Sequence, residues 1–165
     1  MAEILIRQAE LPDLPALIDI FNYYVIHGHV TFETELNTVE SRREWFRGYG
    51  NGRYQLLVAL DGTTPVGCTY SSRYRQRPAF DFTVETSIYL HPQHCGRGTG
   101  SKLYTTLFER LARQPVHMMV AGIALPNDAS IALHRKMGFE EIGTFRDYAS
   151  MQGTWISSTW FQRRV

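Results

Sequence analysis

The sequence has few cysteines, almost no net charge and no long hydrophobic segment. Cys68 and Cys95 are its two thiols, which excludes a small domain held together by disulfide bonds and is typical of a reduced compartment. Lys and Arg total 17 against 16 Asp and Glu, so a net charge of +1 provides no field that would recruit nucleic acid or an anionic membrane. No apolar stretch reaches the ~18 residues of a membrane span, and the N-terminal segment has no signal-peptide pattern. We therefore expect a cytoplasmic protein with neither a nucleic-acid nor a membrane partner.

The rest of the composition is that of an ordinary globular domain. Hydrophobic residues make up 44% and charged residues 20% of the 165-residue chain, and neither a repeat nor a low-complexity segment interrupts it. A chain of this length buries roughly 70% of its unfolded surface, which is enough for a hydrophobic core. We therefore expect residues 1–165 to form a single domain.

Hydrophobic spacing along the chain predicts a mixed sheet with helices packed on it. Apolar residues recur at helical spacing in several segments, whereas runs rich in Val, Ile, Thr and aromatic residues predict strands. Asp61-Gly62 indicates a hairpin turn. Strands are expected at 4–6, 55–60, 64–71, 80–90, 116–125, 139–145 and 154–163, and helices at 14–25, 40–46 and 127–138 and over Leu103, Leu107 and Leu111. This order of elements predicts an α/β fold.

A glycine-rich loop lies between a predicted strand and a predicted helix. Gly96, Gly98 and Gly100 alternate there, so backbone N–H groups can turn inward beside the positive end of the helix, an arrangement that favours phosphate binding. A P-loop is excluded because Ser101 precedes Lys102 where that motif needs Lys directly after its last Gly. The spacing also differs from the GxGxxG of a dinucleotide fold. A glycine-rich turn without a ligand remains open at this point.

Two motifs in the chain together resemble the GNAT N-acetyltransferases. The first is the loop Pro92-x-x-Cys95-Gly96-x-Gly98-x-Gly100, which is similar to that family's pyrophosphate loop, and the second is the segment 127–139, which follows after one helix and one strand. Segments 21–25, 31–35, 84–89, 125–128 and 160–162 narrow the resemblance to the phosphinothricin and methionine sulfoximine acetyltransferases. Cys95 departs from the family, which usually has Gln or Arg at that position. The resemblance implies the GNAT fold, with helices on both faces of a splayed mixed sheet.

The same resemblance implies acetyl-CoA as cosubstrate and a set of residues that bind it. Main-chain groups of one strand would pair with the pantetheine arm as an added strand does and would polarise the thioester oxygen. Asn127 can also act simply as a helix N-cap. The implied cofactor-binding residues are Ile88, Tyr89, Leu90, Cys95, Gly96, Arg97, Gly98, Thr99, Gly100, Ser101, Asn127 and Ser130.

Two residues are candidates for proton transfer. Glu85 lies in an otherwise apolar strand, where partial desolvation would raise its pKa into a range useful for a base. The spacing alone equally allows an ion-paired or solvent-facing Glu, whereas the resemblance implies a general base acting through an ordered water. His134 stands where many GNAT members have a Tyr that protonates the leaving thiolate. A His can perform this step because its pKa lies near neutrality, but a structural role is equally open.

A basic connection before the Glu85 strand is the candidate for substrate selection. Arg73, Arg75 and Arg77 alternate, and a guanidinium matches a carboxylate or phosphinate bidentately. A solvated basic loop is the alternative from the residues alone. The resemblance favours Arg75 and Arg77 and implies that Phe32 and Glu33 form the opposite wall of the substrate site.

Two further clusters are expected to have no site of their own. His91, His94 and Cys95 lack the fourth ligand that a structural zinc site needs, so we expect no metal. The C-terminal aromatic residues Trp155, Trp160 and Phe161 could stack on bases, but without a basic surface they are expected to serve core and dimer packing.

Taken with the resemblance, these residues predict an enzyme that moves acetyl from acetyl-CoA to the α-amine of a small amino acid or analogue, such as phosphinothricin or methionine sulfoximine. The resemblance also implies a homodimer. One alternative is a GNAT enzyme for another amine, such as a polyamine, an aminoglycoside or a protein N-terminus. Another alternative is a non-catalytic sensor of acyl-CoA.

Overall fold

The computed structural model describes residues 3–165, which form one seven-stranded sheet. The strands lie in the spatial order β1-β2-β3-β4-β5-β7-β6. Their bounds are β1 (Ile4–Gln8), β2 (Leu56–Asp61), β3 (Thr64–Arg73), β4 (Thr83–Leu90), β5 (Met118–Ala124), β6 (Glu140–Met151) and β7 (Thr154–Arg164). Neighbouring strands are antiparallel except β4 and β5, which are parallel. The prediction of an α/β fold with a mixed sheet is confirmed.

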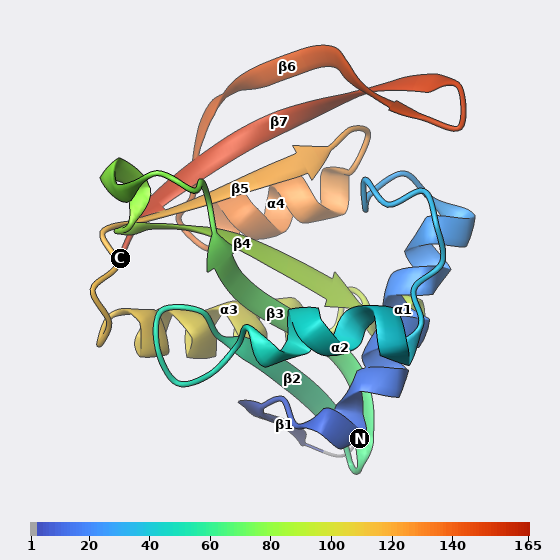
Figure 1. Cartoon of the computed structure of the whole chain (residues 1–165), viewed down its shortest axis with the longest axis vertical. Helices are drawn as coiled ribbons and strands as arrows, with labels where there is room; N and C mark the ends of the chain where they lie inside the picture. Colours follow the sequence, from blue (N-terminus) through green and yellow to red (C-terminus); the bar gives the residue numbers. More distant parts are fainter. Residues whose placement is uncertain (1–2) are drawn as a thin grey trace.

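Helices cover both faces of this sheet (Figure 1). They are α1 (Leu14–His27), α2 (Val39–Arg47), α3 (Thr99–Leu111) and α4 (Asp128–Lys136). One hydrophobic cluster joins α3 and α4 to the sheet, and a second joins α1 and α2 to the opposite face. Leu103, Leu107 and Leu111 are completely buried, as their spacing of four residues on one helix face predicts. No helix among residues 3–165 is long and apolar enough to cross a membrane.

The sheet splits between β4 and β5. These strands pair only through Thr83–Met118, Val84–Met119 and Glu85–Val120. Beyond these pairs β4 runs on to Leu90 and β5 to Ala124 without further pairing between them. Each strand therefore presents an unpaired backbone edge to the space between them, which sets the position of the site described below.

The strand that precedes the split begins later than the sequence pattern suggests. We expect it from residue 80, whereas β4 begins at Thr83 because Pro78–Phe80 forms a 3-10 turn. The Phe80 N–H donates to the Arg77 carbonyl at 2.9 Å, which closes this turn. Proline fixes φ near the value that the turn requires.

The C-terminal hairpin of β6 and β7 extends past the other strands (Figure 1). β6 continues to Met151, six residues beyond the predicted end at Phe145. Its pairing with β7 shifts register between Phe145 and Ala149, and Asp147 within this bulge has φ 47°. Because the bulge interrupts the alternation of apolar and polar residues, the pattern of the sequence ends at Phe145.

Candidate active site

A cavity of about 660 Å³ opens where β4 and β5 diverge. Its walls come from residues 86–90 of β4, residues 121–124 of β5, the glycine-rich loop with the first turns of α3, and α4. Tyr24 of α1 and Val30 close one end. The split sheet, rather than a surface groove, therefore creates the binding space.

The glycine-rich loop has the geometry of an anion site. Gly96 and Gly98 have φ of 72° and 82°, in the left-handed region that favours glycine. Gly98 is the N-cap of α3, so the unpaired N–H groups of the first helical turn lie directly beside the loop. The hydroxyl of Thr99 is buried without a hydrogen-bond partner among the described residues. Free N–H groups at a helix N-terminus fit the phosphate groups of a coenzyme.

The unpaired edge of β4 faces the same cavity. Ile88, Tyr89 and Leu90 all line it, and their other edge pairs with β3. Tyr24 donates its hydroxyl to the Leu90 carbonyl at 2.7 Å, so α1 satisfies the end of this edge. An extended arm could pair with the remaining edge by β-augmentation.

The start of α4 forms the wall opposite the loop. Asn127 caps the helix by accepting from the Ser130 N–H at 3.2 Å, as the N-cap prediction requires. Both residues also line the cavity, and so does Lys136 at the far end of the helix. Lys136 adds a positive charge to this wall.

The predicted cofactor residues thus largely share one cavity. Cys95, Gly96, Gly98, Gly100 and Ser101 line it together with the β4 and α4 residues, whereas Arg97 and Thr99 do not. Arg97 is exposed, and the thiol of Cys95 is exposed as well. The departure from the family at this position therefore leaves a small, accessible side chain at the cavity wall.

Glu85 lies at the last paired position before the strands diverge. Its side chain is half-buried, and burial raises the pKa of its carboxyl above the ordinary value. No cation or hydrogen bond among the described residues offsets this effect. Thr86, the next residue, lines the cavity, so a half-buried carboxylate without a partner among the described residues adjoins the cavity.

His134 lies in the interior wall of the cavity, with 3% of its surface exposed. Its Nδ1 lies 2.8 Å from the Ser130 carbonyl oxygen, which only accepts, so Nδ1 carries the proton. Its Nε2 lies 2.8 Å from the hydroxyl of Tyr104, which therefore donates to it. Burial lowers the pKa of His134 and raises that of Tyr104. Both ring nitrogens are thus engaged in a neutral hydrogen-bonded chain.

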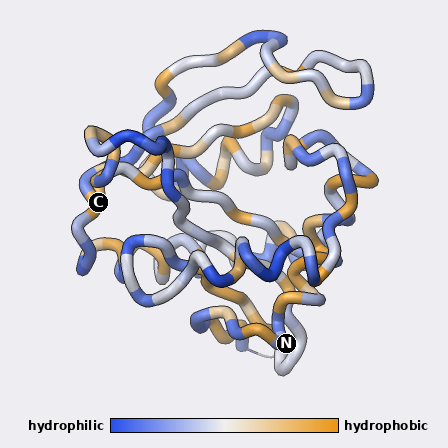
Figure 2. Tube along the Cα trace, viewed as in Figure 1, coloured by the Kyte–Doolittle hydropathy of each residue, from blue (hydrophilic) through white to orange (hydrophobic). Residues whose placement is uncertain are grey.

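The basic connection between β3 and β4 is hydrophilic along only part of its length and hydrophobic along the rest (Figure 2). The guanidinium of Arg75 lies 5.0 Å from the ring centre of Tyr74 and 5.5 Å from that of Phe80. Arg73 instead donates to the Tyr54 hydroxyl at 3.3 Å. Arg77 is exposed at the start of the 3-10 turn. The three arginines therefore have different surroundings, although they occupy every second position of one short segment.

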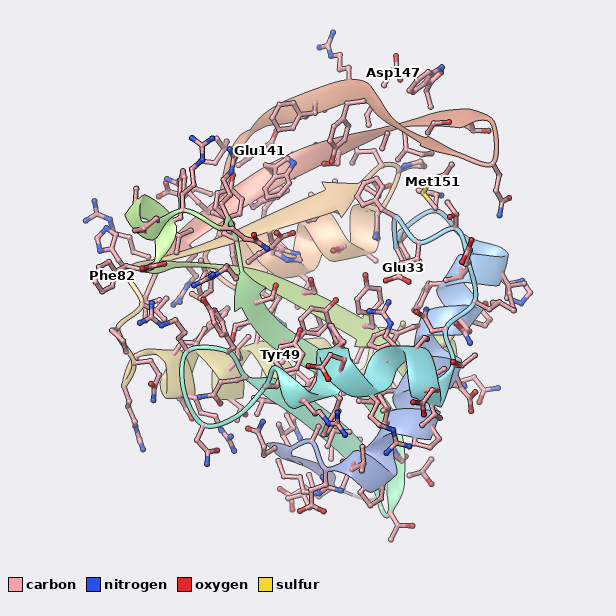
Figure 3. All side chains as sticks on the ribbon, viewed as in Figure 1. Glu33, Tyr49, Phe82, Glu141, Asp147 and Met151 are labelled. Atoms are coloured by element: carbon pink, nitrogen blue, oxygen red, sulfur yellow. The ribbon has the colours of Figure 1, made fainter. Side chains whose placement is uncertain are left out.

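The predicted opposite wall lies on the connection between α1 and α2. Phe32 packs edge-on against Tyr148 of the hairpin, with ring centres 6.1 Å apart. Glu33 forms an ion pair with Arg42 of α2, which compensates its charge. Figure 3 labels Glu33 on this connection. The connection thus links α2 to the β6–β7 hairpin.

Several residues of the cavity were not expected from the sequence. Tyr24 and Tyr104 come from helices whose apolar spacing predicted only packing, and Lys136 lies among charged residues at a helix end. Gly122 carried a usable signal, because glycine inside a strand indicates close approach of another group. No cluster of three potential metal ligands occurs within residues 3–165.

An anion-binding loop at a helix N-terminus, joined to a split parallel pair of strands, defines a transferase that takes its group from an acyl-CoA. The family model described as "Acetyltransferase (GNAT) domain" matches residues 6–160. The chain belongs to this family and is a GNAT acetyltransferase.

Named relatives and a solved structure are similar to this chain over nearly its whole length. A phosphinothricin N-acetyltransferase of Streptomyces coelicolor is 41% identical over 98% of this chain and 96% of its own length. An L-methionine sulfoximine/L-methionine sulfone acetyltransferase of Salmonella typhimurium is 32% identical, covering 97% and 94%. The crystal structure of a GNAT superfamily phosphinothricin acetyltransferase from Sinorhizobium meliloti with acetyl-CoA has a TM-score of 0.92 at 32% identity, covering 98% of this chain and 88% of that one. The predicted family and fold are confirmed.

Proposed function

We propose that this enzyme acetylates the α-amine of a small amino acid or amino-acid analogue. The observation that carries the proposal is the position of Glu85, a half-buried carboxylate without a partner among the described residues, at the point where the acyl-CoA cavity opens between β4 and β5. The names of the phosphinothricin and methionine sulfoximine acetyltransferases among its relatives support the same substrate class.

Residues of three elements would hold the cofactor. The loop at Gly96 and Gly98 and the N-terminus of α3 would receive its phosphates, and the free edge of β4 its pantetheine arm. Lys136 would add charge complementarity. Acetyl-CoA supplies an acetyl group activated as a thioester. Backbone N–H groups of β4 would polarise its carbonyl.

Glu85 would accept the proton that the substrate ammonium must lose before it can attack. Because the carboxyl is only half-buried and adjoins the cavity at Thr86, an ordered water can bridge it to the amine. Its raised pKa makes it a stronger base than an exposed carboxylate.

His134 would serve the leaving-group side. Since Nδ1 is held by the Ser130 carbonyl, the proton available for transfer is one at Nε2, which the ring carries as imidazolium. Burial lowers the pKa of the ring, which makes the imidazolium a stronger acid and a less populated one.

Arg75 and Arg77 would bind the carboxylate of the substrate, opposite Phe32 and Glu33. Arg75 is held by cation–π contacts to Tyr74 and Phe80 while its guanidinium stays exposed, so the fork is oriented and accessible. A polycationic acceptor would meet this positive charge and be disfavoured.

A homodimer in the cytoplasm completes the proposal. The β6–β7 hairpin exposes Ile142, Phe145, Tyr148 and Trp155, with 45–64% of the surface of each residue accessible in one chain. Exposed apolar groups that gather in this way are typical of protein interfaces.

The test measures free thiol released from acetyl-CoA by a panel of amines. The panel contains phosphinothricin, methionine sulfoximine, common L-amino acids, a polyamine, an aminoglycoside and a short peptide. We expect release with amino acids or their analogues at much higher kcat/KM than with the other amines. Release only with a polyamine, an aminoglycoside or the peptide would contradict the proposed substrate class. Acetyl-CoA binding in a calorimeter without release from any amine would indicate a sensor instead.

A further inference from the structure

Trp160 of β7 lies between two glycines of the neighbouring strands. It pairs with Gly122 of β5 on one side and with Gly143 of β6 on the other. A β-carbon built on Gly122 would come within 2.9 Å of Cε2 and Cζ2 of the indole, closer than real β-carbons approach. The absence of a side chain at Gly122 therefore lets the indole lie flat against the backbone of β5.

The strand register places this indole on the same face of the sheet as Glu85. Glu85 pairs with Val120, and Gly122 is two residues further along β5, so their side-chain directions share one face. Two residues of an extended strand span ~7 Å. Gly122 also lines the acyl-CoA cavity, so the indole lies beside the place where acetyl transfer would occur.

An aromatic chain continues from Trp160 to the proposed carboxylate-binding arginine. The ring of Tyr74 meets the indole edge-on, with ring centres 6.1 Å apart. The guanidinium of Arg75 lies 5.0 Å from the ring centre of Tyr74 and donates to the Tyr74 hydroxyl at 3.3 Å. A chain of contacts thus runs from Gly122 at the cavity wall through the rings of Trp160 and Tyr74 to the guanidinium of Arg75.

The exposure of Trp160 also differs from that of its neighbour in sequence. Phe161 points to the opposite face and is completely buried in the core, whereas Trp160 is only half-buried. Its indole N–H has no acceptor among the described residues. Part of the indole is therefore accessible from the face of the sheet that carries Glu85.

We propose that Trp160 is a specificity-determining residue for the acceptor, with its indole forming the wall against which an apolar acceptor side chain packs. This inference rests on the proposed function. An amino acid whose carboxylate reaches Arg75 and whose amine reaches Glu85 lays its side chain along the ring pair of Trp160 and Tyr74. The preferred acceptors are amino acids with compact, apolar side-chain ends. Glycine has no side chain to contact the indole, so Trp160 does not contribute to its binding.

The test compares acceptors with and without a side chain. Trp160→Ala is expected to lower kcat/KM for methionine sulfoximine and for aliphatic amino acids by ~10–100-fold, because it removes one aromatic contact surface for the acceptor side chain. Its kcat/KM for glycine and its KM for acetyl-CoA should change less than about twofold. Trp160→Phe keeps a flat ring and should restore most of the preference. Leu5→Ala removes an apolar side chain from the edge strand β1, where 56% of the residue is exposed, and is the control that should leave both acceptors unaffected.

A binding measurement separates this inference from the proposed function. In the turnover-deficient Glu85→Gln background with Trp45→Phe and Trp155→Phe, Trp160 is the remaining tryptophan of three, so its fluorescence reports acceptor binding directly. We expect methionine sulfoximine to change this signal and glycine to leave it unchanged. Equal losses for glycine and larger acceptors in Trp160→Ala, or no loss for either, would overturn the inference although acetyl transfer to amino acids persists. A wild-type enzyme without any amino-acid activity would instead overturn the proposed function.

Discussion

The hydroxyl of Tyr104 lies 2.8 Å from Nε2 of His134, and both side chains are buried where the sheet divides. Tyr104 comes from α3 and His134 from α4, so this hydrogen bond joins the two helices behind the cavity. Because the other ring nitrogen is held by the Ser130 carbonyl, removal of the tyrosine hydroxyl leaves Nε2 buried without a partner.

Tyr104→Phe should therefore lower the free energy of unfolding by ~1–3 kcal/mol, the usual cost of an unsatisfied buried polar group. Combined with His134→Leu, the same change should cost less than the sum of the two, because no acceptor remains to be orphaned. Urea denaturation of the four proteins measures this coupling. Tyr23→Phe on the exposed part of α1 is the control. Additive costs would show that the hydrogen bond is not formed in solution.

The neutral His134 also predicts how stability depends on pH. Its pKa is lowered from the usual 6.5 by burial, so the unfolded chain binds a proton more readily than the folded one. Stability from this group is present above pH ~6.5 and is lost as pH falls through the lower pKa of the folded state. The wild type should thus lose stability relative to His134→Leu in that window. A difference between the two proteins that stays constant from pH 8 to 5 would contradict a buried neutral ring.

Replacing Glu85 by Gln should lower kcat by ~10²–10⁴-fold if the carboxylate is the base. The pH dependence of activity gives an independent test. Only the ionised carboxylate can accept a proton, and burial raises the pKa of Glu85. The activity of the wild type should therefore be lost on acidification at a higher pH than an exposed carboxyl, with its pKa near 4.5, would give. Stopped assays of thiol release across pH measure both quantities. Glu44→Gln, with 87% of the Glu44 side chain exposed on α2, is the control. An unchanged kcat in Glu85→Gln would make Glu85 a structural residue.

The position of Glu85 illustrates what the sequence could predict and what it could not. A run rich in Val, Ile, Thr and aromatic residues placed it on a strand before the glycine loop, and the loop and the cap at Asn127 followed from local rules of φ and hydrogen bonding. The divergence of β4 from β5 is a non-local event that depends on where pairing stops, after Glu85–Val120. Local patterns therefore identified the chemical groups, whereas the cavity between them required the tertiary structure.

The same limit explains the residues that were missed. Tyr104 and Tyr24 follow helical periodicity like any core residue, and their hydroxyl groups gain meaning only from partners 30 and 66 positions away. Arg42 likewise lies on α2 among charged residues, and its ion pair with Glu33 depends on how the connection between α1 and α2 folds back. Sequence spacing carries no information on such pairings.

Arg75→Ala should raise KM for acceptors that carry a carboxylate by ~10-fold or more, because a charge-assisted hydrogen bond contributes ~1.5–3 kcal/mol. The corresponding decarboxylated amines should be affected much less. Steady-state kinetics with matched pairs of an amino acid and its amine measure the difference. Arg113→Ala, an exposed change beyond the end of α3, controls for net charge. Equal effects on both members of a pair would exclude Arg75 as a carboxylate ligand.

Gly98→Ala should weaken acetyl-CoA binding and the fold together. Gly98 has φ 82° and forms the N-cap of α3, and a non-glycine residue in the left-handed region costs ~1–2 kcal/mol. No neighbouring atom lies within 4 Å of a β-carbon built there, so the cost arises from the backbone and not from a clash. If the loop relaxes to another φ, its N–H groups turn away from the phosphates, and KM for acetyl-CoA should rise several-fold more than KM for the acceptor.

Calorimetry with CoA and thermal unfolding measure the two effects. Gly50→Ala is the matched control, because its β-carbon also meets open space and its φ lies outside the left-handed region. A Gly98→Ala protein with unchanged CoA affinity would show that the loop conformation does not serve phosphate binding.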